Sequence, residues 1–454
     1  MPDILIVILA VVFVLGIAIN IHEFGHFMVA KSLGMRVEAY SFFGLGPRIW
    51  GFKVGHTDYR ISAIPLGAYV KLYGDEATAS LEGGESADET VPDSELYELR
   101  PRWQKFLVML GGPFMNIVLA LAIPFGAAVL YGVPSMPAPV VGLVSPNGAA
   151  EKAGIKIGDR VTSFNGTDNP TWEHIRDETM ISPGKSLPLV VDRGGQPLTL
   201  NITPEKKDLD GNGVGEVGMR PDAGVEPVEA LSLVPGSPAE SSGIVPGDKV
   251  MAYNGETVRN GDELTARIRA NKDAAIRLTI DRNGERKELV MQPRLDSDGV
   301  YRIGGTFGAS DITTRVPVGI MGAAAYAVDT NLRIIRLTGR VFGQLFAGER
   351  SVKDAGLAGP VGIVQIISKV VRDAGFGGLV LILGVISLNL GVFNLLPIPL
   401  LDGGQIMVLG IEKVMSWFGR TLSLAWKERI QLTGLAVILL LMVFTLFLDI
   451  SKFF

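Results

Sequence analysis

The chain has 454 residues, of which 47% are hydrophobic, and its mean hydropathy is positive at +0.32. This length is enough for two or three domains, and this hydropathy predicts a membrane protein with a substantial soluble part. The net charge of −5 gives no reason to expect a nucleic-acid partner. The chain has no cysteine, which excludes disulfides and thiolate metal ligands.

Four stretches are long and apolar enough to span a bilayer. They cover residues 4–30, 106–132, 374–401 and 430–448. Asp3 is the only early charge, so the first stretch lacks the basic start of a cleavable signal peptide. The sequence therefore predicts a polytopic α-helical membrane protein with four transmembrane helices.

Lysine and arginine are concentrated in two of the loops between these spans. One loop follows the first span and includes Lys31 and Arg36, and the other precedes the fourth span and includes Lys413 and Arg420. The positive-inside rule places both loops on the cytoplasmic side. The two termini and the long segment between the second and third spans are then expected outside.

The first span ends in the motif His22-Glu23-Phe24-Gly25-His26. On a helix, His22 and His26 are one turn apart on the same face, so both imidazoles can bind one Zn²⁺. Glu23 lies beside them, where it can take a proton from the attacking water. Ionisable groups inside a span are costly and usually functional, so we expect a metal site rather than two core histidines. The motif predicts peptide-bond hydrolysis inside or at the edge of a bilayer.

A zinc hydrolase needs a third protein ligand and an open position for water. We do not expect another histidine, because His56 lies in a predicted hairpin and His174 lies in the outward segment. The candidate is Asp402, at the cytoplasmic end of the third span. Pro397 and Pro399 break the helix there, and irregular backbone at membrane depth is tolerated where it lines a cavity. Both span ends lie on the same side, so Asp402 can meet the two motif histidines.

The loop after the first span contains two unlike pieces. Residues 50–73 alternate Tyr, Ile and Val around turn residues, which predicts a β-hairpin. Residues 75–98 contain nine acidic residues and no Lys or Arg, which predicts a mobile loop without an assigned role.

The outward segment contains an internal repeat, because residues 149–166 match residues 238–255 at a constant offset. A repeat of this kind indicates a duplicated domain rather than a solenoid. Both copies resemble bacterial PDZ domains, with the shared pattern A-x-x-x-G-I-x-x-G-D-x-V-x-x-x-N-G. PDZ domains bind extended peptides by strand addition, so peptide C-termini are candidate ligands and a steric size filter is the alternative.

Apolar residues recur at helical spacing from Met321 to Phe346, with charged residues on the other faces. This pattern predicts an amphipathic helix lying on the outer membrane surface. Packing of this helix against the second PDZ-like domain is the alternative.

Three motifs together resemble the site-2 protease family of intramembrane zinc metalloproteases. They are HEFGH in the first span, GGPFMN at the start of the second and N-x-x-P-x-P-x-x-D-G at the end of the third. With its paired PDZ-like domains, the chain is similar to the bacterial regulator-of-sigma-E protease type. The resemblance implies one zinc ion and the following residue roles: metal ligands His22, His26 and Asp402, general base Glu23, and substrate-binding residues Asn394, Pro397, Pro399 and Asn116.

The resemblance also implies how the enzyme handles its substrate. It would hydrolyse transmembrane segments of single-span proteins, such as an anti-sigma factor or remnant signal peptides, in the bacterial inner membrane. Residues 51–74 would form a membrane-dipping hairpin whose edge strand pairs with an unwound substrate. The outward PDZ-like domains would gate access to the active site, which would lie near the cytoplasmic side.

The alternative from another class is a membrane-anchored PDZ scaffold without protease activity. Glu23 speaks against it, because a structural metal site needs no base. A metalloprotease with an extramembrane site and a transporter are further alternatives, disfavoured by the apolar run around the motif and by the small number of spans.

The complete prediction adds a membrane-associated β-hairpin and two inserted PDZ-like α+β domains to the four spans. Its segments are the first span with HExxH (1–32), the hairpin and acidic loop (33–103), the second span (104–132), two PDZ-like domains (139–222 and 223–296), amphipathic or peripheral helices (317–372), the third span with the LDG sequence (374–404) and the fourth span (430–449).

Overall fold

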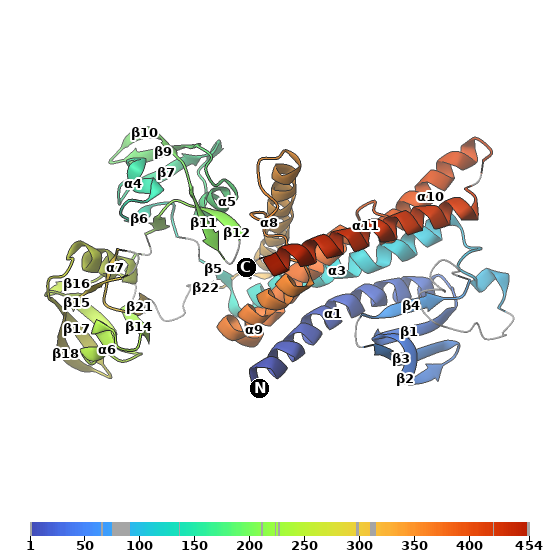
Figure 1. The fold of residues 1–454 in the computed structure, drawn as a ribbon, viewed down its shortest axis with the longest axis horizontal. Helices are drawn as coiled ribbons and strands as arrows, with labels where there is room; N and C mark the ends of the chain where they lie inside the picture. The colour runs from blue at the N-terminus through green and yellow to red at the C-terminus, as the bar shows by residue number, and fades with distance from the viewer. Residues whose placement is uncertain are drawn as a thin grey trace. The chain divides into compact units, whose positions relative to one another are not determined.

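The computed structural model describes residues 2–64, 67–74, 91–135, 137–209, 212–222, 224–225, 228–296, 299–308, 315–420 and 422–451 (Figure 1). The chain divides into two compact units. The first unit comprises residues 1–133, 317–336 and 357–454, and the second comprises residues 134–316 and 337–356. Most of the predicted acidic loop, residues 75–90, lies outside the described residues.

Four helices in the described part of the first unit are long and apolar enough to cross a membrane, as the sequence predicted. They are α1 (Pro2–Ser32), α3 (Arg102–Tyr131), α9 (Pro360–Asn394) and α11 (Leu424–Ser451), which run side by side in Figure 1. A Cβ added to Gly25 would lie 2.1 Å from the carbonyl oxygen of Gly111. Glycines at this crossing therefore let α1 and α3 pack backbone to backbone.

The third span differs from its prediction at its C-terminal end. α9 contains a kink at Gly375, whose φ of 58° and ψ of −151° are non-helical and separate two helical segments, so the predicted start of the span at 374 coincides with this break. Glycine adopts a positive φ at little cost. α9 ends at Asn394 rather than at 401 or 404, because Pro397 and Pro399 lack a backbone N–H.

A helix that the sequence reading did not predict, α10 (Asp402–Trp417), follows α9 closely. Gly403 and Gly404 are buried in its first turn. A Cβ on Gly403 would lie 2.3 Å from the Leu395 carbonyl carbon, and one on Gly404 would lie 2.1 Å from the Ile398 oxygen. The two glycines therefore allow α10 to begin directly against the preceding loop, which fixes the position of Asp402.

A four-stranded sheet follows α1 and packs against it. Its strands are β1 (Val37–Phe43), β2 (Leu45–Val54), β3 (Thr57–Ile64) and β4 (Tyr69–Leu72), in the order β2-β3-β1-β4. The predicted hairpin corresponds to the antiparallel pair β2 and β3, and the sheet is larger than predicted because β1 pairs in parallel with β3. β4 pairs with β1 and lies at the edge of the sheet.

The second unit contains two lobes that repeat the same element order. The first lobe comprises β6 (Val141–Val144), α4 (Ala149–Lys152), β7 (Arg160–Phe164), α5 (Trp172–Ile181), β9 (Leu187–Arg193), β10 (Gln196–Ile202) and β13 (Met219–Pro221). The second comprises β14 (Val228–Leu233), α6 (Pro238–Ser241), β15 (Lys249–Tyr253), α7 (Gly261–Ala270), β17 (Ile276–Arg282), β18 (Glu285–Met291) and β21 (Gly305–Gly308). Each lobe has its own buried apolar core.

The second lobe continues beyond the predicted boundary at 296. β21 pairs with β14 as β13 pairs with β6 in the first lobe, so Gly305–Gly308 belongs to the domain. The remaining short elements are η1 (Asp93–Glu95), β5 (Val133–Pro134), β8 (Thr167–Asp168), β11 (Glu205–Leu209), β12 (Asn212–Glu216), β16 (Glu256–Thr257), β19 (Arg294–Leu295), β20 (Tyr301–Arg302) and β22 (Arg315–Val316).

The predicted amphipathic helix is present as α8 (Ile320–Phe346). In the second unit, its last turns contact the first lobe rather than the second. Arg340 forms a two-pronged ion pair with Glu178, and the Gln344 amide donates a hydrogen bond to the Ile181 oxygen at 2.9 Å. This end of α8 is therefore attached to a PDZ-like domain.

Candidate metal centre

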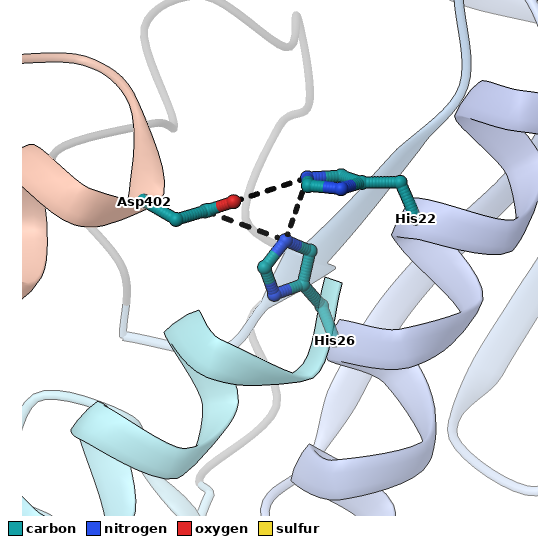
Figure 2. Close-up of side chains that lie close together, drawn as sticks. All are labelled: His22, His26 and Asp402. Carbon is teal, nitrogen blue, oxygen red and sulfur yellow. Dashed lines mark hydrogen bonds and ion pairs between the residues drawn. The ribbon is translucent and has the colours of Figure 1, made fainter. Parts of the chain in front are cut away.

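His22, His26 and Asp402 converge on one point in the first unit, although they are distant in sequence. The Nε2 atoms of the two histidines on α1 lie 3.2 Å apart, and both rings face the carboxylate at the start of α10 (Figure 2). Asp402 Oδ2 lies 3.1 Å from His22 Nε2, and Asp402 Oδ1 lies 3.4 Å from His26 Nε2. Among the described residues, this is the group of His, Asp or Glu side chains whose ligand atoms gather as a metal site requires, all within 4.8 Å.

The outer nitrogen of each imidazole is held by α3. His26 Nδ1 lies 2.7 Å from the carbonyl oxygen of Val108, to which it can donate. His22 Nδ1 lies 3.2 Å from the side-chain amide of Asn116, which is fully buried. Partners of this kind fix ring orientation and leave the Nε2 atoms directed at the common point.

The site has space for a cation because one position of α3 has no side chain. A Cβ on Gly112 would lie 2.4 Å from His26 Nε2 and 2.8 Å from His22 Nε2. The Asp402 Oδ2 atom is buried and accepts no hydrogen bond, in spite of its short distance to His22. Two facing imidazole nitrogens and an unsatisfied carboxylate oxygen are chemically suited to Zn²⁺ with an open fourth position, and this donor set can also bind Fe²⁺ or Co²⁺.

A cavity of about 220 Å³ opens onto these ligands. Glu23 lies at its wall, beside the backbone of Val70 on β4. The cavity is lined by His22, Glu23, His26, Val70, Leu72, Val108, Met109, Asn394, Leu400, Leu401, Asp402 and Gln405. A carboxylate beside a metal position and a small cavity is placed to exchange protons with a water or a substrate amine.

Tyr40 on β1 lies next to this wall. Burial, and then the nearby Glu23 carboxylate, raise the pKa of Tyr40 to about 12. Its hydroxyl therefore stays protonated at neutral pH and donates to the Asn20 carbonyl oxygen at 3.3 Å. Tyr40 joins the sheet to α1 rather than acting as a second base.

The residues predicted to bind substrate do not all reach the cavity. Asn394 does, with its Nδ2 atom 3.3 Å from His22 Nε2. Pro397 and Pro399 are not among the lining residues, and they shape the loop between α9 and α10. Asn116 lies behind His22, on the side of the ring that faces away from Asp402.

The sequence reading missed Gly112, Val108 and Val70. Gly112 belongs to the GGPFMN motif, so a signal for it was present in the sequence. Val108 and Val70 act through backbone atoms, which leave no trace in residue type. Only the packing of α3 and β4 around α1 identifies them.

Comparison with known proteins shows similarity to a family of peptidases over most of the chain. The model of peptidase family M50 matches residues 10–441. Protease RseP of Yersinia pestis is 30% identical over 483 residues, covering 100% of both chains. The regulator of sigma-E protease RseP of Escherichia coli K12 is 29% identical over 461 residues, covering 96% of this chain and 97% of that protein. A Vibrio cholerae relative whose name describes a zinc metalloprotease is 28% identical over 473 residues, covering 100% of both.

One of the solved structures that are similar to part of this chain is a single domain. The PDZ domain of an SdrC-like protein from Listeria monocytogenes is 18% identical, covers 18% of this chain and 85% of its own, and has a TM-score of 0.17. A likeness at that score adds nothing to the strand order and repeat already described.

Proposed function

Because this chain belongs to peptidase family M50 and is a site-2 zinc metalloprotease of regulated intramembrane proteolysis, we propose that the His22, His26 and Asp402 group is its metal centre. The observation that carries this assignment is the convergence of three ligand atoms at the end of a helix that is apolar enough to span a membrane. One zinc ion fits, because the three residues supply one set of ligands. When bound, zinc supplies Lewis acidity that polarises the scissile carbonyl and makes water a better nucleophile at neutral pH.

Glu23 is the general base and acid in this proposal. It takes the proton of the attacking water and later gives it to the leaving amine. Its carboxylate lies at the cavity wall, next to both histidines and beside Val70 of β4. A structural metal site needs no such group, so Glu23 argues against the scaffold alternative.

The edge strand β4 is the proposed docking strand for substrate. It carries Val70 and Leu72 into the cavity, and its outer edge has no partner strand among the described residues. A transmembrane helix hides its peptide bonds in internal hydrogen bonds, so a substrate must unwind before cleavage. Pairing with β4 would replace those bonds, and Asn394 would hold the peptide near the metal. Helix-breaking substitutions in a substrate span should then help cleavage, and slower cleavage would count against unwinding.

The arrangement in the membrane is also proposed. The positive-inside rule places the metal centre toward the cytoplasmic side of the bacterial inner membrane, with the termini and the PDZ-like lobes outside. The lobes would restrict access of substrates that have large outer domains. Capture of peptide C-termini in their grooves is the second candidate role, supported by the strand order of the lobes.

A direct test compares wild-type protein with Glu23→Gln in detergent, using a single-span substrate and mass spectrometry of the products. The amide keeps the shape of the carboxylate but cannot accept the proton, so we expect cleavage inside the span to fall by about 10²-fold or more. Zinc content should be unchanged, because Glu23 is not a ligand. Equal cleavage by zinc-loaded Glu23→Gln would show that Glu23 is not the general base. A cut outside the span would favour a protease with an extramembrane site.

A further inference from the structure

Behind His22, two polar side chains are completely buried between the first three spanning helices. Asn116 on α3 and Ser387 on α9 both have 0% exposed surface. The side-chain nitrogen of Asn116 lies 3.2 Å from His22 Nδ1, and the Ser387 hydroxyl lies 3.2 Å from the side-chain oxygen of Asn116. Ser387 Oγ also donates to the Asn116 backbone oxygen at 2.9 Å. Buried polar groups are costly unless satisfied, so this chain of contacts calls for an explanation.

The explanation begins with the two nitrogens of His22. Nε2 faces His26 and Asp402, so it is the nitrogen that would bind the ion. A ligating nitrogen carries no hydrogen, and a neutral imidazole has one, which must therefore lie on Nδ1. An Nδ1–H needs an acceptor, and the Asn116 amide is the side-chain group that reaches it.

The orientation of that amide decides which tautomer it supports. If its oxygen faces His22, it accepts from Nδ1–H, and its NH₂ group faces Ser387. The Ser387 hydroxyl then accepts from the amide and donates its own hydrogen to the Asn116 backbone oxygen. If the NH₂ group faces His22 instead, it donates to Nδ1 and forces the hydrogen onto Nε2, which blocks metal binding. The structure draws the NH₂ group toward His22, but the oxygen and nitrogen of an amide have nearly the same shape, and their assignment follows from the hydrogen-bond network. The first orientation is the one that suits the loaded site, because it leaves Nε2 without a hydrogen.

The backbone of α9 is built to present this serine. Ser387 and Asn394 are seven residues apart, so they share one face of the helix. Ser387 contacts Asn116, the partner of His22 Nδ1, and Asn394 contacts His22 Nε2 directly. Gly391 lies between them, where a Cβ would be 3.0 Å from the Pro113 oxygen and 3.2 Å from the Asn116 Cβ. Without a side chain at Gly391, α9 approaches α3 closely enough for the hydroxyl to reach the amide.

We propose that Ser387 is a positioning residue of the metal centre, whose hydroxyl orients the Asn116 amide so that His22 keeps its hydrogen on Nδ1 and its Nε2 free for the ion. Asn116 then supports a ligand rather than contacting substrate. This inference rests on the proposed metal centre and extends it to the buried side chains behind His22. Partners of this type typically contribute 10- to 100-fold to metal affinity.

The test compares two isosteric substitutions, Ser387→Thr and Ser387→Val, in the full chain in detergent. Both add the same bulk to a packed site, and only threonine keeps the hydroxyl. Zinc retention is measured against increasing chelator, and the visible absorption of the Co²⁺-loaded protein reports ligand geometry. We expect Ser387→Val to lose zinc at about 10- to 100-fold less chelator than Ser387→Thr and to change the Co²⁺ spectrum. Equal retention and equal spectra would overturn the proposal.

A second pair tests the amide itself. Asn116→Asp keeps an oxygen that accepts from Nδ1–H, whereas Asn116→Leu keeps only the volume. We expect the aspartate variant to retain zinc and the leucine variant to lose it, and the opposite order or equal retention would contradict the mechanism. Ser368→Ala, on the same helix but outside this contact chain, serves as the control. If wild-type protein holds no zinc that His22→Ala removes, the metal centre itself is wrong, and the role of Ser387 falls with it.

Discussion

Gly112 illustrates how one residue without a side chain determines the chemistry of this site. Both imidazole Nε2 atoms lie where its Cβ would be, at 2.4 and 2.8 Å. A methyl group there can be accommodated only if the rings turn away or α3 moves away from α1. The distances between ligands at the end of α1 therefore depend on a neighbouring helix as much as on the HExxH motif.

We predict that Gly112→Ala weakens zinc binding by about tenfold or more, because displaced imidazoles no longer share one ligand geometry with Asp402. Chelator competition on the purified protein measures the change. Gly126→Ala is a matched control on the same helix, since a Cβ there meets nothing within 4 Å. If both variants hold zinc equally well, the packing of α3 does not set the ligand geometry.

At the scale of elements, β4 joins the sheet to the metal centre. It is an edge strand, it lines the cavity, and its Val70 lies beside the Glu23 carboxylate. Proline is tolerated at strand edges but has no N–H to donate. Substitution of this one residue therefore removes a donor while leaving the side-chain chemistry of the site intact.

We predict that Val70→Pro lowers the cleavage rate by about tenfold through loss of one backbone N–H of the proposed docking strand beside Glu23. Val70→Ala, which keeps the N–H, should cleave at close to the wild-type rate. Zinc content checks that the metal centre is intact in both. A Val70→Ala defect as large as that of Val70→Pro would mean that the side chain, not the backbone, matters.

For the whole molecule, the two lobes of the second unit are stabilised separately by equivalent buried ion pairs. Arg193 donates two hydrogen bonds of 2.7 Å to Asp159 in the first lobe, and Arg282 does the same to Asp248 in the second. Burial acts to raise the pKa of both carboxyls, but the arginine and backbone hydrogen bonds outweigh it and hold each pKa below its usual value. Each pair joins the end of one strand, β9 or β17, to the residue just before the neighbouring strand, β7 or β15.

We predict that Asp159→Asn reduces hydrogen-exchange protection in residues 140–221 but not in the second lobe, and that Asp248→Asn does the reverse. A lowered folded-state pKa adds stability above the ordinary carboxyl pKa, and that stability is lost as pH falls through the folded value. The difference between each variant and wild type should therefore be large at neutral pH and vanish in strong acid. Loss of protection in both lobes from one substitution would mean that they unfold as one body.

The sequence by itself determined what depends on local spacing and on long apolar runs. His22 and His26 share a helix face because they are four residues apart. The helices that are long and apolar enough to cross a membrane follow from uninterrupted hydropathy, and the duplicated domains follow from the repeat. Asp402 could be nominated because prolines and glycines around it interrupt a span. The C-terminal end of the third span and the end of the second lobe were misplaced, because Pro397 and Pro399 follow the early end of α9 and β21 completes a sheet.

The tertiary structure alone decided which backbone and small residues complete the site. Val108, Val70 and Ser387 have no chemical signature in the sequence, and Gly112 is marked there only as part of the GGPFMN motif. Each of the four matters because α3, α9 or β4 packs against the end of α1. Contacts of this kind depend on the register and distance between elements that are far apart in the chain. A one-dimensional pattern specifies which face of a helix is polar, but the close approach of three helices at their glycines brings those faces together.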